Sequence, residues 1–250
     1  MSNPVKIDRS VKHGRHSGGL GIEILFPGLV LENGDSGVGA IGRIDHAHFR
    51  PGSRVPMHPH KNDEILTYLR AGAITHYDTV GHVEEVTPQR LMLMNAGHTF
   101  QHEEVSAPDS EPLAALQIFM RPRAEDLEPM VQFHDFDAAY SLNQWRLLAG
   151  PTEAPLVLRA EAWIHDARLL TRHTLRVPET PAAEAARLLY VFSGAITVTG
   201  LSLKEGESAF LDGNQDIIEA VVQSDLVFFT TDLSAPVFKK GMFSGNVLSA

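Results

Sequence analysis

The chain has 250 residues, of which 43% are hydrophobic and 21% charged, an ordinary composition for one large or two small soluble globular domains. Its net charge of −10 argues against a general nucleic-acid or acidic-membrane surface, because binding phosphates needs clustered Lys and Arg. The absence of cysteine excludes disulfides, thiolate metal ligands and a cysteine nucleophile.

The first residues, Met1–Lys6, lack the apolar stretch that is typical of a signal peptide. No run in the chain approaches the 18 apolar residues of a membrane-spanning helix. We therefore expect a soluble, cytoplasmic protein with no membrane partner.

Glycine and proline interrupt the chain at short intervals, and most of the segments between them are rich in Val, Ile, Thr, Tyr and Phe. Several segments alternate apolar and polar residues, which predicts an all-β sandwich or barrel. The predicted strands are Gly39–His48, Glu64–Leu69, Ala73–Tyr77, Arg90–Met94, Leu113–Met120, Leu156–Leu158, Arg187–Phe192 and Ala195–Val198. One turn of helix is expected over Glu125–Met130.

Two segments far apart in the chain share a pattern, which indicates an internal duplication. Residues 64–75 and 187–197 each consist of a β-like run, a turn at Gly72 or Gly194, and a second β-like run. The long period indicates a tandem pair of domains, not a solenoid. We place the boundary near Phe133–Ser141 and predict domains over residues 1–135 and 136–250.

Two couplets in the first half indicate a metal site: His58-Pro59-His60 and His102-Glu103-Glu104. Successive side chains of a strand alternate between its faces, so residues two apart point the same way. Two neighbouring strands can therefore direct three imidazoles and one carboxylate at a common point. Neutral imidazole with carboxylate is a ligand set for Fe, Mn, Ni, Cu or Zn.

The surroundings of the couplets resemble a known family. Gly52, His58, His60, Glu64 and Gly72 follow the spacing of the first cupin motif. The stretches HPHKNDEILTY at 58–68 and AGHTFQHEE at 96–104 are similar to the pirin family, bicupins that include quercetinase-like enzymes. The resemblance covers most of the chain and is strongest over 52–122. It implies two tandem cupin β-barrels of the double-stranded β-helix or jelly-roll type, with few short helices.

The resemblance also implies a chemistry. His58, His60, His102 and Glu104 would bind one transition metal ion per chain, with iron favoured and Mn, Ni, Cu, Co and Zn left open. Two positions on an octahedral metal would remain for a flavonol or similar aromatic substrate and O2. The expected activity is that of a quercetin 2,3-dioxygenase, an oxidoreductase that cleaves the activated ring with loss of carbon monoxide. Glu104 is the expected catalytic residue, either as a ligand or as a base.

A second interpretation is a regulatory or redox-sensing pirin, which turns nothing over and acts through protein partners. Both interpretations need the same four ligands, so the sequence does not separate them. It also leaves open the physiological substrate, the metal and the oligomeric state.

Six other residues near the motifs have weaker assignments. We expect Glu64 to orient a ligand histidine, and His46 and His48 to lie at the surface or behind the ligands. His98 is expected in a solvated loop. Phe100 and Gln117 are candidates for lining the metal cavity.

The second half has few of the residues that bind metals. Of 13 histidines, 11 lie at or before His134, and only His165 and His173 follow. The segments matched with the two couplets are Pro181–Glu184 and Asp212–Gln215, which carry no histidine. We therefore predict a second barrel without a metal of its own.

Overall fold

The structure, a computed structural model, describes residues 4–17, 20–179, 181–182, 184–213 and 216–248, with the side chains of 15–17 left out. Met1, Ser2, Asn3, Ala183, Asn214 and Gln215, on which parts of the sequence interpretation rest, lie outside these ranges. Strands dominate, accompanied by the 3-10 helices η1 (Arg9–Val11) and η2 (Pro27–Leu31). None of the described helices is long and apolar enough to cross a membrane.

The strands of the first half are β2 (His13–Ser17), β3 (Leu20–Leu25), β4 (Ile41–Phe49), β5 (Arg54–His60), β6 (Glu64–Ala71), β7 (Ile74–Asp78), β8 (Val83–Val86), β9 (Arg90–Asn95), β10 (Phe100–Ser106), β11 (Leu113–Met120) and β12 (Met130–Asp135). The remaining strands are β1 (Val5–Ile7), β13 (Arg146–Gly150), β14 (Leu156–Val157), β15 (Ala162–Leu169), β16 (Thr174–Arg176), β17 (Ala185–Ser193), β18 (Ala195–Val198), β19 (Leu201–Lys204), β20 (Ser208–Phe210), β21 (Ile217–Ala220) and β22 (Ser224–Asp232).

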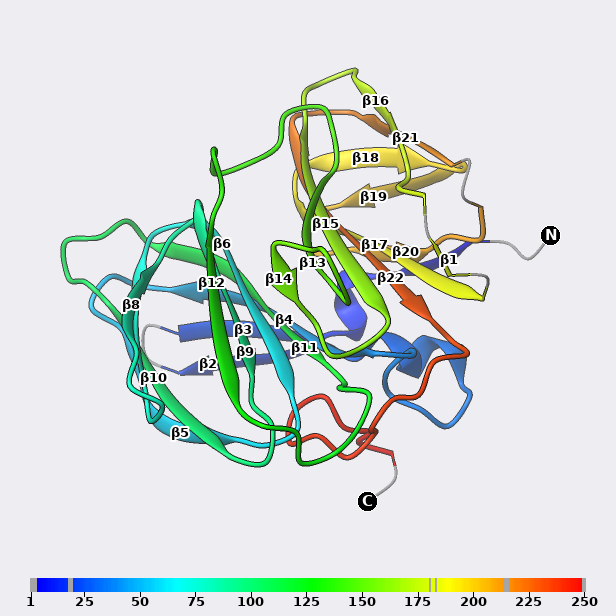
Figure 1. The fold of residues 1–250 in the computed structure, drawn as a ribbon. Coiled ribbons are helices and arrows are strands. Elements are labelled where there is room, and N and C mark those ends of the chain that lie inside the picture. The colour runs from blue at the N-terminus through cyan, green and yellow to red at the C-terminus, as the bar shows by residue number, and fades with distance from the viewer. Residues whose placement is uncertain (1–3, 18–19, 180, 183, 214–215, 249–250) are drawn as a thin grey trace.

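The strands form four sheets, two in each half (Figure 1). The first half pairs a seven-stranded sheet, β12-β9-β6-β11-β4-β3-β2, with a four-stranded sheet, β5-β10-β7-β8. The second half repeats the arrangement with β1-β20-β17-β22-β15-β13-β14 and β16-β21-β18-β19. The all-β tandem cupin fold is thus confirmed, although each half is an open two-sheet jelly roll and not a closed barrel.

Three apolar cores hold the sheets together. One lies inside the first sandwich and includes Ile65, Met92 and Phe119. Another lies inside the second sandwich and includes Leu189 and Phe228. The third contains buried residues of both large sheets and joins the halves. Burial of apolar surface dominates the stability of such layers, so the third core holds the two halves together.

The internal repeat is visible in the structure. Gly72 and Gly194 both have positive φ, at 74° and 89°, a conformation that costs glycine little. Each marks the point where the chain passes from the large sheet to the small one, from β6 to β7 and from β17 to β18. The same turn therefore serves the same place in both halves.

The two ends of the chain cross to opposite halves (Figure 1). Strand β1 pairs antiparallel with β20, so the N-terminal strand is the edge of the second half's large sheet. The C-terminal segment returns to the first half, where the backbone N–H of Ser244 donates to Asp63 at 2.8 Å. We propose the division into 1–135 and 136–250 for the two repeats, with these end segments exchanged between them.

All eight strands predicted from the sequence are present, two of them with identical bounds. The helical turn expected over Glu125–Met130 is wrong, since 123–126 are bends, 127–129 have no regular structure and β12 begins at Met130. Asp126 adopts a left-handed φ of 52°, and Pro129 lacks the amide hydrogen that a helix needs.

Candidate metal centre

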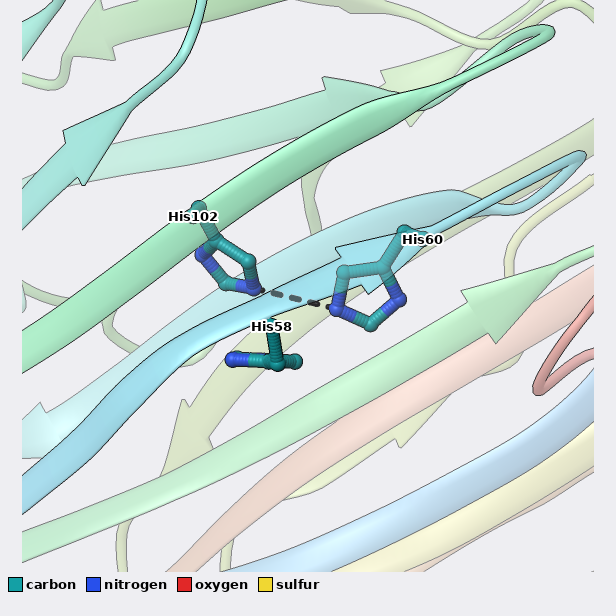
Figure 2. A group of neighbouring side chains, drawn as sticks. All are labelled: His58, His60 and His102. Atoms are coloured by element: carbon teal, nitrogen blue, oxygen red, sulfur yellow. Dashed lines mark hydrogen bonds between the residues drawn. The ribbon is translucent and has the colours of Figure 1, made fainter.

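Three histidines meet on neighbouring strands of the small first-half sheet (Figure 2). His58 and His60 come from β5 and His102 from β10, and the antiparallel register sets His102 opposite His58. One ligand nitrogen from each imidazole lies within 4.8 Å of the others, and no further His, Cys, Asp or Glu in the described part of the chain joins this group. The period-two geometry of the strands thus brings three of the four predicted ligands together.

Hydrogen bonds leave the Nε2 atoms of two of these histidines as acceptors. His58 Nδ1 lies 2.8 Å from the carbonyl oxygen of Pro56, which can only accept, so its hydrogen sits on Nδ1. His102 Nδ1 lies 3.4 Å from Nδ1 of His76. His76 Nε2 in turn lies 2.9 Å from the carboxylate of Asp78. Asp78 therefore fixes the hydrogen of His76 on Nε2, and the hydrogen of His102 falls on Nδ1.

The third imidazole completes a cluster with the chemistry of a metal site. His60 Nε2 lies 3.0 Å from His102 Nε2, and its Nδ1 has no hydrogen-bond partner. Because His102 Nε2 is an acceptor, His60 Nε2 carries the hydrogen of this contact. With that hydrogen moved to Nδ1 of His60, all three neutral imidazoles would offer an Nε2 lone pair to a transition-metal ion. Burial lowers the pKa of His58, His76 and His102, which favours the neutral form that ligation requires.

Glu104 lies close to the cluster but outside the group of three. Its Oε1 is 3.9 Å from Nδ1 of His102, on the side of the ring away from the shared Nε2 contact. His102 and Glu104 form the regular i, i+2 pair that the sequence predicts, and β10 pairs with β7 without interruption, but β5 has one extra residue between Val55 and His58, so Glu104 lies opposite Val55. Gln117 Nε2 donates to both carboxylate oxygens at 3.0 Å. Burial raises the pKa of Glu104 to about 7, against the opposing effect of Gln117.

Aromatic side chains surround the histidines. Phe100 is 1% exposed, and its ring centroid lies 5.8 Å from that of His102. Phe243, from the C-terminal segment, lies 4.9 Å from His60 and 5.3 Å from Phe119. Phe100 and Gln117, both predicted as lining, do lie against the site.

Two parts of the site escaped the sequence interpretation. His76 and Asp78 form a third i, i+2 couplet, and β7 pairs directly with β10, so the spacing was a usable signal. Phe243 carried no such signal, because it lies more than 180 residues beyond His60 in the chain. Its position depends on Asp63, which accepts hydrogen bonds from the backbone N–H groups of Phe243 and Ser244.

Other predicted residues lie elsewhere. Glu64 faces the second half, where Arg159 donates to it at 2.8 Å and Asn95 also bonds to it, so it does not orient a ligand histidine. His46 is 2% exposed and contacts the second half, which corrects the surface assignment, whereas His48 is exposed. His98 is an exposed loop residue, as predicted.

The strand order corrects the matching between the halves. In the second small sheet, β16 and β21 occupy the places that β5 and β10 hold in the first. The positions equivalent to the couplets are therefore Thr174–Arg176 and Ile217–Ala220, and not Pro181–Glu184 and Asp212–Gln215. The chain between β16 and β17 is longer than that between β5 and β6, so residues at the same distance from the repeated glycine turn are not equivalent in the two halves. The replacement positions also carry no histidine.

A tandem cupin with converging histidines in its first half is typical of one class of metal-binding proteins. Comparisons with known proteins indicate which family within this class the chain resembles. The sequence model of the pirin family matches residues 39–120. Quercetin 2,3-dioxygenase of Escherichia coli K12 is 27% identical over 198 residues, covering 77% of this chain and 83% of the relative. A Pseudomonas aeruginosa protein named putative quercetin 2,3-dioxygenase is 29% identical over 201 residues, covering 72% and 60%.

The solved structures agree on the fold. The crystal structure of bacterial pirin YhhW from Escherichia coli in complex with nickel(II) superposes with a TM-score of 0.78 at 22% identity, covering 94% of this chain and 100% of that one. The sequence match over residues 39–120 and these relatives support the pirin family, and the solved structure shows that the cupin fold is shared.

Proposed function

We propose that this pirin is a metal-dependent dioxygenase of the quercetin 2,3-dioxygenase type, acting with O2 on a flavonol or a similar aromatic compound in the cytoplasm. The observation that carries the proposal is the convergence of His58, His60 and His102 with their tautomers set by Pro56 and His76. The relatives named quercetin 2,3-dioxygenase support the choice of reaction.

His58, His60 and His102 would hold the metal through Nε2, with Glu104 as the fourth ligand or as a neighbouring base. We propose iron, because a set of imidazoles with one carboxylate is typical of non-haem iron sites. The same donors can also bind Mn, Ni, Cu, Co or Zn. When bound, such an ion supplies Lewis acidity that lowers the pKa of a substrate hydroxyl.

The protein's own residues would prepare the substrate. Glu104, with its pKa raised to about 7 by burial, is suited to accept the proton of the flavonol hydroxyl near neutral pH. Gln117 would keep the carboxylate in place while the proton is transferred. Phe100, Phe119 and Phe243 would hold the aromatic rings and exclude water.

The test is loss of quercetin absorbance together with O2 uptake and release of carbon monoxide by metal-loaded protein. The expected result is turnover with one or more of Fe, Mn, Ni, Cu and Co, and a large loss of turnover in Glu104→Gln. A matched control is Glu103→Gln, the neighbouring carboxylate, which pairs with Arg54 and should leave turnover unchanged. No O2 uptake with any of these metals would contradict the enzyme and favour the regulatory alternative.

A further inference from the structure

A cleft of about 500 Å³ lies beside strands β3 and β4, and none of its lining residues belongs to the metal centre. Its polar lining comes from Arg9, Glu23, His46, His48 and Arg50. His46 contacts Tyr190 and Phe192 of the second half, whereas Phe49 and Leu113 of the cleft belong to the core inside the first sandwich, so the cleft lies at the edge between these two layers.

His46 has an unsatisfied polar atom at this cleft. The residue is 2% exposed, and its Nε2 has no hydrogen-bond partner. Its ring stacks on His48 at 4.8 Å and packs on Phe192 at 4.6 Å. Buried polar atoms in proteins are almost always paired, so an unpaired one in a cleft wall indicates a missing partner.

The hydrogen-bond chain behind His46 shows that the unpaired atom is a donor. Lys12 Nζ donates to the Tyr190 hydroxyl at 2.6 Å, because an ammonium group has no acceptor. The hydroxyl's own hydrogen then goes to Nδ1 of His46, 3.0 Å away. Nε2 therefore carries the hydrogen of the imidazole. Burial lowers the pKa of His46 to about 3, so the ring stays neutral.

The charges around the cleft favour an anion. Around the cleft, Arg9 and Lys12 pair with Glu23, and Arg9 also pairs with Glu205. Arg9 donates two hydrogen bonds to the carboxylate of Glu23, which neutralises its charge. Arg50 is exposed and has no ion-pair partner in the described ranges. A local excess of positive charge stands out in a chain whose net charge is −10.

We propose that this cleft binds a small organic carboxylate, independently of the reaction proposed for the metal centre. One carboxylate oxygen accepts from His46 Nε2–H and the other pairs with the Arg50 guanidinium. The apolar part of the ligand lies against Leu20, Phe49 and Leu113. The volume falls in the usual range for small-molecule sites, and a charged acceptor forms stronger hydrogen bonds with these donors than a neutral one.

The test uses benzoate as the probe and benzamide, which has the same shape without the charge, as its control. Each is titrated into the full-length, metal-free protein while the imidazole resonances are followed by NMR. Benzoate should shift the His46 resonances in a saturable way and bind about tenfold or more tightly than benzamide.

Two variants separate binding from folding. His46→Phe keeps an aromatic ring and removes the N–H donor. Arg50→Gln changes an exposed side chain, so a loss of binding in this variant would not come from misfolding. Each variant should weaken benzoate binding about tenfold. His173→Phe, at an exposed site of the second half, and His60→Ala, in the metal centre, should leave it unchanged. No saturable shift up to about 20 mM benzoate, far above millimolar affinity, would overturn the proposal. Equal binding of benzamide, or unchanged binding in both His46→Phe and Arg50→Gln, would overturn it as well.

Discussion

At the scale of single residues, the metal centre depends on which nitrogen of each histidine carries the hydrogen. Pro56 and the His76–Asp78 pair direct the hydrogens of His58 and His102 to Nδ1. Partners of this kind set both the orientation and the basicity of a ligand. Metal affinity should therefore depend on residues that never touch the ion.

Removing a ligand should remove the metal. We expect His60→Ala and His102→Ala each to lose most bound iron, because the two remaining imidazoles and Glu104 are too few ligands to hold the ion tightly. The measurement is elemental analysis of purified protein. His98→Ala, in an exposed loop, serves as the control and should keep full occupancy. Full occupancy in both ligand variants would place the metal elsewhere.

Removing the charge behind His76 should weaken the metal without deleting a ligand. In Asp78→Asn the side-chain oxygen can still accept from the backbone N–H groups of Val80 and Gly81, but the amide donates where the carboxylate accepted. His76 would then present a hydrogen to His102. We expect metal affinity to fall about 10- to 100-fold, measured by chelator competition. The control is Asp137→Asn at an exposed position. Equal metal affinity in the two variants would contradict the hydrogen-bond chain from Asp78 through His76 to His102.

At the scale of elements, the large sheets are covered on both faces. The alternation of apolar and polar residues along a strand therefore could not show which layer lies on each face. Leu91, Met92, Leu93 and Met94 of β9 are all 0% exposed. Leu91 and Leu93 belong to the core between the halves, and Met92 and Met94 to the core inside the first sandwich. A uniformly apolar run shows that a strand is buried but not what lies on each side.

The sequence therefore predicted strands and turns well and layers poorly. Glycine turns and β-branched runs are local signals, and so are couplets such as His58 and His60. The contact of Phe243 with His60, and the pairing of Glu64 with Arg159, join residues too distant in the chain for any local pattern to record. The extra residue of β5 between Val55 and His58, opposite His102 and Glu104, has no sequence signal either, because no residue type marks a register shift.

The N-terminal strand should stabilise the second half although it comes from the other end of the chain. Ile7 is 1% exposed within the core between the halves, whereas Val5 on the same strand is 38% exposed. Ile7→Ala should lower the free energy of unfolding by about 2–4 kcal/mol, through lost burial and the cavity left behind. Val5→Ala, the control, should change it by less than about 1 kcal/mol. The measurement is denaturant unfolding, and equal effects would show that β1 does not pack as described.

At the scale of the whole molecule, buried ion pairs accompany the shared core. Arg70 of the first half bonds to Asp225 of the second at 2.5 Å. A similar buried pair anchors the C-terminal segment: Arg121, 0% exposed, donates to Asp35 and to the carbonyl of Ser244. Removing one partner of such a pair leaves a buried charge uncompensated.

The Arg121–Asp35 pair should make stability depend on pH in a defined window. Burial alone would raise the pKa of Asp35, but hydrogen bonds from Arg121 and Lys239 lower it to about 2, below its usual 3.8. The carboxylate thus contributes stability fully above about pH 4, and the contribution is lost as pH falls toward 2. Asp35→Asn should cost about 3 kcal/mol at pH 7. The difference from the unmodified protein should shrink between pH 4 and 2, measured by denaturant unfolding; a difference that is constant with pH would contradict it.

The two halves should differ in metal content. The second-half strands that match β5 and β10 carry no histidine, and His165 and His173 lie eight residues apart. We expect one tightly bound ion per chain in excess metal, and an unchanged content in the His165→Ala and His173→Ala variants. Two tight ions, with the second lost in these variants, would contradict the prediction.

The exchanged ends have a consequence for synthesis on the ribosome. Strand β1 emerges first, yet its partner β20 follows about two hundred residues later. The carboxylate of Asp63 likewise has no partner until Phe243 and Ser244, about 180 residues further along the chain, have been translated. Domains usually fold as units during elongation, N-terminal first. In this nascent chain β1 has no sheet to join until β20 has emerged, and the wall of the metal centre closes only after Phe243 has been translated.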